Sequence, residues 1–342
     1  MAIHQSLCVR GGVAVLEEGP RPLDILVAPG GLELLDPGTA AGGSVIDASG
    51  CWVFPGLING HDHLDFGGLR RRRPRTRYAD YREWAADLHR GWRGLRLRTT
   101  WRRRRARRCV QAAWLNRRAG VTTVAHHNPI EPWMPSERFP LRIVERMGWY
   151  HSHSFGAGGA RRSLESTPPD WPWVIHVGEG TSDRCRWELD FLEAEGCLGP
   201  RTVVVHGLAL RTKELERLAV AGAALVWCPT SNLYLYGQTL NPRSFPPELR
   251  VALGTDSALT AAGGLLDELR TARQLGAEPD QLLSMVTIAA ASIYRLGQRF
   301  GRLAAGAAPD LVVAPKRSDD PAADLCTYQP RDLRAVICRA GV

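Results

Sequence analysis

Two kinds of hydrophobic patterning divide the chain. The first 55 residues carry short apolar or β-branched runs separated by glycine and proline turns, a pattern typical of a small antiparallel sheet. These runs are Leu7–Val9, Val13–Leu16, Leu23–Val27 and Ser44–Ile46. Similar runs return near the other end of the chain, at Leu311–Val313 and Leu333–Cys338. We therefore expect the two ends to form one small β domain together.

From Pro55 onward, apolar strand-like runs alternate with segments of helical length. The predicted strands are Gly56–Asn59, Val121–Ala125, Trp149–His153, Trp173–Val177, Val203–His206, Ala223–Trp227 and Val251–Leu253. The predicted helices are Ala79–His89, Arg102–Arg118, Leu141–Met147, Arg184–Glu195, Lys213–Ala221, Gly264–Leu275 and Thr287–Leu296. Repeated strand–helix units predict a parallel α/β sheet that is either closed or doubly wound. One segment, Gly156–Pro172, is too short for a regular strand and helix, so we expect the fourth strand–helix unit to be shortened or irregular.

The composition is that of a globular chain with one unusual segment. Of the 342 residues, 44% are hydrophobic and 23% charged, which excludes a disordered or fibrous chain. The net charge of +9 is local, because residues 70–108 hold 17 Arg against three acidic side chains and the remainder carries −5. This arginine-rich segment is a solvated helix face, a gate for an anionic substrate, or a contact for an acidic partner; nucleic acid is the least favoured partner.

Cysteine usage and the absence of apolar spans predict the compartment. None of the eight cysteines has the spacing of a zinc ribbon or a redox pair, so we expect buried thiols in a reducing environment. Residues 1–12 lack the pattern of a signal peptide, and no run of about 20 apolar residues predicts a membrane helix. A cytoplasmic location without membrane contact is therefore predicted.

Side chains able to bind metal or carry protons follow the ends of several predicted strands. They are His61, His63, His176, Glu179, His206 and Asp256. His61 and His63 are two residues apart on a strand, so they face the same way. Parallel strands bring their carboxyl ends to one face, and imidazoles with a carboxylate there suit zinc or iron.

Each of these residues also has a plainer interpretation. An isolated His-x-His pair is often two loop histidines, Glu179 can cap the helix that follows it, and a single histidine is often part of a core. The argument for a metal site rests on the set, because random placement would put many of the ten histidines in helices.

Seven motifs carry a resemblance to a known superfamily. In chain order they are Pro55–His63 (PGLINGHDH), Gly120–Val124, His176–Glu179, His206–Gly207, Cys228–Asn232 (CPTSN), Leu253–Asp256 (LGTD) and Gly301–Val313. This ordered set resembles the amidohydrolase superfamily, and within it the branch of cytosine and guanine deaminases and triazine hydrolases. The resemblance implies a distorted (β/α)8 TIM barrel at 55–302, with a small β-sandwich formed by 1–54 and 303–342.

The resemblance also implies how the site works. It implies one divalent metal, zinc or alternatively iron, held by His61, His63, His176 and Asp256. Glu179 would shuttle a proton between a metal-activated water and the substrate, and His206 would polarise the substrate or orient the water. Asp256 would also accept a proton. Both lysines of the chain come after His176, so the bridging lysine of two-metal relatives is missing.

The predicted reaction is hydrolytic deamination of a small nitrogen-rich heterocycle or amidine. Cleavage of a cyclic amide, or displacement of halide or alkylamine, is the alternative for the same site, and a non-catalytic binding barrel is the less favoured one. A small-molecule substrate is expected, and a homodimer is compatible with the resemblance. Four further histidines, which either line the pocket or only pack, are His126, His127, His151 and His153.

Overall fold

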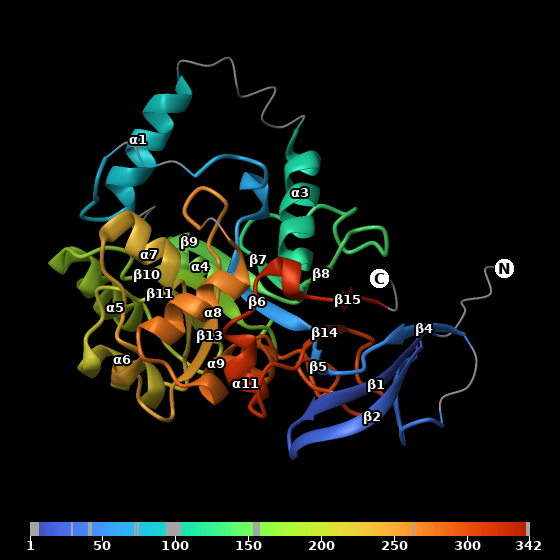
Figure 1. Cartoon of the computed structure of the whole chain (residues 1–342). Helices are drawn as coiled ribbons and strands as arrows, with labels where there is room; N and C mark the ends of the chain where they lie inside the picture. Colours follow the sequence, from blue (N-terminus) through green and yellow to red (C-terminus); the bar gives the residue numbers. More distant parts are fainter. Residues whose placement is uncertain are drawn as a thin grey trace.

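The chain forms a TIM-barrel-like α/β unit beside a sheet built from both of its ends (Figure 1). The computed structural model describes residues 7–28, 30–39, 43–71, 73, 75–93, 104–152, 158–261 and 263–339. In Figure 1 the blue strands of the N-terminal segment and the red strands of the C-terminal segment lie together, to one side of the barrel strands.

Eight parallel strands make up the barrel-like part, in two hydrogen-bonded groups. One group is β6 (Leu57–Asp62), β7 (Val121–His126) and β8 (Arg142–Ile143). The other is β9 (Gly148–Ser152), β10 (Trp173–Val177), β11 (Thr202–His206), β12 (Ala224–Trp227) and β13 (Arg250–Leu253). The groups meet where Thr255 donates its backbone N–H to the carbonyl of His61, at 2.9 Å. No ladder joins β8 to β9 within the described ranges, so hydrogen bonds do not close the barrel there.

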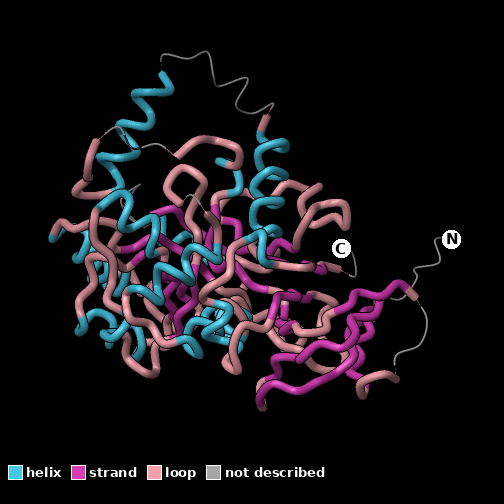
Figure 2. Tube along the Cα trace, viewed as in Figure 1, coloured by secondary structure: helices cyan, strands magenta, loops and turns pink. Residues whose placement is uncertain are grey.

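Helices follow most of these strands and surround them (Figure 2). Their bounds are α1 Tyr81–Arg93, α3 Arg105–Arg118, α4 Gly159–Ser166, α5 Asp183–Ala194, α6 Thr212–Val220, α7 Pro229–Tyr236, α8 Leu265–Gln274, α9 Pro279–Met285 and α10 Ile288–Ile293. A further short helix, α11 (Pro321–Leu325), lies in the C-terminal segment. The segment leading into α1 is fixed to α7, because Tyr78 donates its backbone N–H to the carbonyl of Leu235.

The two ends of the chain share one seven-stranded sheet, as predicted. Its members are β1 (Leu7–Leu16), β2 (Gly19–Ala28), β3 (Gly31–Leu35), β4 (Ser44–Asp47), β5 (Cys51–Pro55), β14 (Leu311–Pro315) and β15 (Ala335–Ile337). β14 pairs antiparallel with both β5 and β15, which joins the first strands to the last. These seven strands form one sheet, and a sandwich needs two. The expected β-sandwich therefore stays a prediction, as do the domain limits at residues 54 and 302.

Apolar burial explains why the two parts hold together. Trp173 and Trp227 lie fully buried between the barrel strands and their helices. A separate core covers one face of the terminal sheet, where Ile25, Leu311 and Ile337 pack together. Two apolar runs predicted as separate strands form the single strand β1, whose register shifts at a bulge between Val9 and Gly12.

The prediction for the third barrel strand is wrong. The expected helix Leu141–Met147 is extended chain that contains β8, which pairs with β7 and contributes apolar residues to the core. The strand at Trp149 is therefore the fourth of the barrel and not the third. The segment Gly156–Pro172, expected to be shortened or irregular, contains a short helix, α4, of eight residues. Residues 153–157 lie outside the described residues.

All eight cysteines are buried free thiols, as predicted. Over the described ranges, no helix is long and apolar enough to cross a bilayer.

Candidate active site

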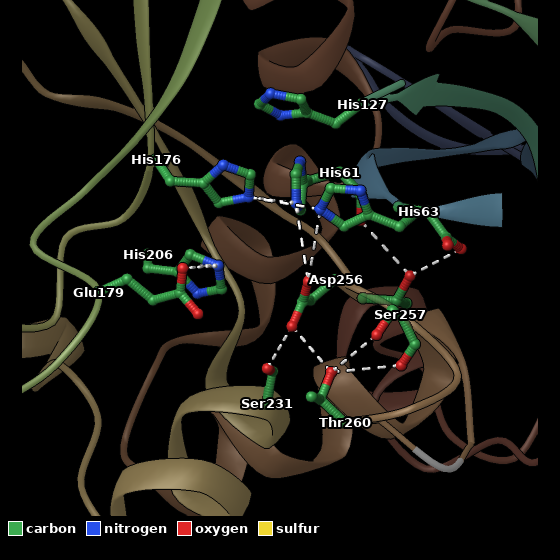
Figure 3. A network of polar contacts seen from close by, with 12 residues as sticks. His61, His63, His127, His176, Glu179, His206, Ser231, Asp256, Ser257 and Thr260 are labelled. Carbon is green, nitrogen blue, oxygen red and sulfur yellow. Dashed lines mark hydrogen bonds and ion pairs between the residues drawn. The ribbon is translucent and has the colours of Figure 1, made fainter. Parts of the chain in front are cut away.

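The six residues singled out from the sequence meet at the carboxyl ends of the barrel strands (Figure 3). In chain order they are His61 in β6, His63 just after it, His176 in β10, Glu179 in the following turn, His206 at the end of β11 and Asp256 after β13. All of them are buried, with exposed fractions from 0% to 7%. Side chains from four strands thus share one water-poor centre.

Three imidazoles and one carboxylate converge on a single point. His176 Nε2 lies 3.1 Å from His61 Nε2 and 3.4 Å from His63 Nε2. Asp256 Oδ1 lies 3.8 Å from the Nε2 atoms of both His61 and His63. The ligand atoms of His61, His176 and His206 also lie within 4.8 Å of one another.

The hydrogen bond at the far side of the His176 ring shows that its Nε2 presents a lone pair. His176 Nδ1 lies 2.6 Å from the carbonyl of His151. A carbonyl only accepts, so Nδ1 carries the proton and Nε2 of the neutral ring is free to bind an electrophile. Burial, and then the neighbouring imidazoles, lower the pKa of His61 and His176 well below the usual value, which favours neutral rings.

The converging Nε2 atoms fit a divalent cation. His176 Nε2 lies 3.1 Å from the Nε2 atom of His61 and 3.4 Å from that of His63, so one cation can bind all three nitrogens when none of them carries a proton. Imidazoles with one carboxylate are the donor set of zinc and of other first-row metals. The residues present therefore fit the metal that the sequence predicts.

Asp256 is held so that one oxygen faces the histidines. Its Oδ2 accepts hydrogen bonds from Ser231 Oγ at 2.5 Å and from Thr260 Oγ1 at 2.8 Å, which leaves Oδ1 toward the imidazoles (Figure 3). Its φ is +63°, and that of His206 is +69°. Non-glycine residues in this left-handed region store strain of about 1–3 kcal/mol, a feature that clusters at functional sites.

Two glycines let β6 and β13 approach closely enough to bring their ligands together. A Cβ on Gly60 would lie 2.9 Å from the carbonyl oxygen of Leu253. One on Gly254 would lie 2.8 Å from Cβ of His61. Larger residues at either position would therefore push His61 and Asp256 apart.

Glu179 lies next to the cluster and has two polar neighbours. The Tyr236 hydroxyl donates a hydrogen bond to Glu179 Oε1 at 2.9 Å, and His206 Nε2 lies 3.7 Å from Glu179 Oε2. Burial raises the pKa of Glu179 to about 7. A carboxyl with a pKa near neutrality both accepts and returns a proton efficiently at that pH.

His206 is oriented by α7. Its Nδ1 donates to Asn232 Oδ1 at 2.9 Å, so the lone pair of the neutral ring is on Nε2. Nε2 has no hydrogen-bond partner among the described residues, and it faces Glu179. This nitrogen is placed to accept a proton or a hydrogen bond at the same centre.

The additional histidines pack around the converging imidazoles. His127 stacks on His176 with ring centroids 4.4 Å apart, and its Nε2 faces the carbonyl of Tyr150 at 3.2 Å. His151 stacks on His176 at 5.1 Å. His126 is fully buried at the end of β7. His153 lies outside the described residues.

Sequence reasoning missed several side chains that support the site. Ser231 and Asn232 lie in a motif quoted for the resemblance, but no role was assigned to them. Tyr236 was not singled out at all. A signal was present, because Asn232 and Tyr236 are four residues apart in a helix that begins at Pro229, so they share a face.

One end of the arginine-rich segment contributes to the site's support. Arg105 of α3 binds Asp65 Oδ1 at 2.5 Å and pairs with Glu131. Asp65 Oδ2 in turn accepts from Asn128 Nδ2, which lies 3.3 Å from His63 Nδ1. At least one arginine of this segment is thus a structural partner of a buried carboxylate and not a free surface charge.

Comparison with known proteins agrees with this geometry. The model of the Amidohydrolase family matches residues 174–338. A 5-methylthioadenosine/S-adenosylhomocysteine deaminase of Syntrophobacter fumaroxidans is 26% identical, over 90% of this chain and 84% of the relative. The guanine deaminase of Escherichia coli is 28% identical, over 54% of this chain and 45% of the relative.

A solved structure shares the fold over nearly the whole chain. The atrazine chlorohydrolase of Arthrobacter aurescens TC1, complexed with zinc, superposes with a TM-score of 0.75 at 17% identity. The match covers 98% of this chain and 94% of that one. The predicted resemblance to the amidohydrolase family is confirmed, and the named deaminase relatives support a hydrolase that acts on carbon–nitrogen bonds.

Proposed function

We propose that the protein is a mononuclear, metal-dependent aminohydrolase that releases ammonia from a small nitrogen-rich heterocycle or amidine. The observation that carries the proposal is the convergence of three imidazole Nε2 atoms and Asp256 Oδ1 beside the buried carboxyl of Glu179. The names of the deaminase relatives support deamination as the reaction class.

The metal is held by His61, His63, His176 and Asp256 in this proposal. Zinc is preferred and iron is the alternative, because both accept this nitrogen and oxygen donor set. The zinc in the related atrazine chlorohydrolase structure supports that preference. When bound, a divalent metal lowers the pKa of a coordinated water toward 7 and so supplies a nucleophile at neutral pH.

Glu179 moves the proton in this proposal. In its ionised form the carboxylate accepts a proton from the attacking water, and it then donates that proton to the nitrogen that leaves as ammonia. Its pKa of about 7 keeps both forms populated at neutral pH. Tyr236 holds Oε1, so Oε2 is the oxygen directed toward His206.

His206 and Asp256 complete the assignment. His206 Nε2 orients the water or binds the substrate, and Asp256 Oδ2 keeps its two hydroxyl partners while Oδ1 faces the ligands. Asp256 also serves as a second proton acceptor. The burial of all these groups excludes bulk water, which strengthens every electrostatic contact made with the substrate.

The remaining assignments are coarser. The eight buried thiols favour a reducing compartment, so we propose the cytoplasm. A small molecule is the proposed substrate, and homodimer formation stays a prediction.

Ammonia release from a panel of aminated purines, pyrimidines, triazines and pterins tests the proposal. We expect turnover of one class by the zinc-loaded protein. The Glu179→Gln variant keeps its metal and loses about 10²–10⁴ in kcat, the usual share of general acid–base catalysis. Loss of metal in this variant would instead make Glu179 a ligand. Hydrolysis without ammonia release would favour ring opening or displacement of halide or alkylamine by the same site.

A further inference from the structure

A cavity lies between the segment that precedes α1 and the helices α7 and α8. Its volume is about 530 Å³. Among its lining residues are Arg71, Arg73, Thr230, Tyr234, Asp267 and Arg270. Nothing in the proposed reaction uses this cavity, although three arginines border it.

Two of the arginines are fixed against one aromatic ring. The guanidinium carbon of Arg71 lies 3.7 Å from the centroid of the Tyr234 ring, and that of Arg73 lies 4.7 Å from it. Arg71 Nε also donates to the carbonyl of Thr260 at 2.8 Å, and Arg73 Nη1 donates to the carbonyl of Tyr234. These contacts orient both cations while leaving N–H groups for another acceptor, since each guanidinium has five.

Neither arginine of this pair forms a salt bridge with a carboxylate in the described part of the chain. The salt bridges within 4.0 Å include none from Arg71 or Arg73. The nearby Asp267 is paired with Arg270. Glu268, which also interacts with Arg71, is fully buried and binds Thr230, and burial raises its pKa to about 8. Arg75 of the same segment does have a carboxylate partner, because its Nε lies 2.7 Å from Asp87 Oδ2.

The cavity is connected to the metal centre through short contacts. Thr260, whose carbonyl binds Arg71, donates its hydroxyl to Asp256 Oδ2. Thr230, on the cavity wall, is next to Ser231, which binds the same oxygen. A single residue, Thr260, therefore links a ligand bound by Arg71 to the carboxylate of Asp256, which faces the histidines.

We propose that this cavity binds an oxyanion, a phosphate or a carboxylate, through the guanidinium groups of Arg71 and Arg73. Guanidinium N–H groups match the geometry of these anions, and charge-assisted hydrogen bonds to them are about twice as strong as neutral ones. The oxyanion is either part of the substrate or a separate small molecule. The binding does not depend on the deaminase assignment.

Isothermal titration with inorganic phosphate, at constant ionic strength, tests the site in the metal-loaded protein. We expect saturable binding by the wild type and binding that is about tenfold or more weaker in the Arg71→Gln/Arg73→Gln variant. Glutamine keeps a polar side chain but removes the charge. The matched control is Arg107→Gln, an exposed arginine of α3, for which we expect unchanged binding.

Several results would overturn the proposal. One is that the wild-type protein does not bind phosphate. Another is that the double variant binds phosphate as tightly as the wild type, because phosphate bound at the metal centre would not be affected by the two substitutions. The single variant Arg73→Gln, with its unfolding temperature measured, keeps the test valid if the double variant unfolds. Weaker binding by the control to the same extent would indicate only a general effect of net charge.

The source of the oxyanion is distinguished with a matched pair of substrates. Adenosine and adenosine 5′-monophosphate share the aminated ring and differ in the phosphate. A rise of KM in the double variant for the monophosphate alone indicates an anion carried by the substrate. Phosphate binding without any such difference indicates a separate ligand. Failure of both compounds to release ammonia would count against this reaction without affecting the phosphate titration.

Discussion

The hydroxyl of Tyr236 is the contact that most directly links the fold to the proposed proton transfer. It is fully buried on α7 and donates to Glu179 Oε1 at 2.9 Å. The substitution Tyr236→Phe removes this one hydrogen bond and keeps the ring that packs beside Tyr78 and Leu235. The carboxylate then loses a fixed donor on one oxygen and can rotate away from His206.

The size of the effect follows from the kind of hydrogen bond that is lost. A hydrogen bond to a charged group contributes about 1.5–3 kcal/mol, which corresponds to a rate factor of about 10–150 if the whole contribution is made in the transition state. We therefore expect kcat to fall by about 10–100-fold. Metal content should not change, because Glu179 is not a proposed ligand.

The pH profile gives a second readout. Burial raises the pKa of Glu179 to about 7, and the bond from Tyr236 opposes that rise because it favours the ionised form. Without the hydroxyl, the pKa rises further. The low-pH limb of kcat, which reports the group that must be ionised, should move to higher pH.

Steady-state kinetics on the best substrate of the ammonia panel measure both effects. The matched control is Tyr328→Phe, which removes an equally buried hydroxyl that binds the carbonyl of Pro315 in the terminal sheet. An unchanged kcat and pH limb in Tyr236→Phe would refute the positioning role. An equal loss in the control would show that the effect comes from stability.

Three further predictions concern stability and metal affinity. Arg105→Ala removes the cation shared by the carboxylates of Asp65 and Glu131 and should lower the free energy of unfolding by about 1–3 kcal/mol, measured by chemical denaturation. Gly67→Ala places a Cβ 2.1 Å from a backbone oxygen of α3 and should lower it by about 1–3 kcal/mol, whereas Gly199→Ala, with open space around it, should change it by less than about 0.5 kcal/mol. Equal effects of the two substitutions would contradict the packing argument. Thr260→Val removes a hydroxyl that orients Asp256, so we expect the affinity for the metal to fall about 10–100-fold. Competition with a chelator measures this affinity. An unchanged affinity would show that the hydroxyl is not needed.

Most of the barrel could be predicted because its strands are fully buried. In runs such as Val203–His206, the residues that precede the histidine are apolar on both faces of the strand. The structure has the strand β11 at this position, and all of its residues are buried. The third strand could not be found, because β8 has only two residues and two residues carry no periodicity. Its apolar neighbours then suggested a helix, since apolar residues at 141, 144 and 147 have helical spacing.

The candidate site shows the same division. Residues at strand ends could be identified because chain order and strand direction bring them to one face, as with His61, His176 and His206. The groups that orient them could not, because they come from helices and loops whose packing the sequence pattern does not specify. Tyr236 and Asn128 acquire their roles only from the tertiary contacts with Glu179 and His63.

The metal content of the purified protein tests the central claim most directly. Elemental analysis after reconstitution with zinc should find about one ion per chain in the wild type, since the two candidate groups of donors in the described residues share His61. The His61→Ala variant should bind far less metal, with its far-ultraviolet circular dichroism spectrum unchanged. Full occupancy in that variant, or no metal in the wild type, would contradict the account.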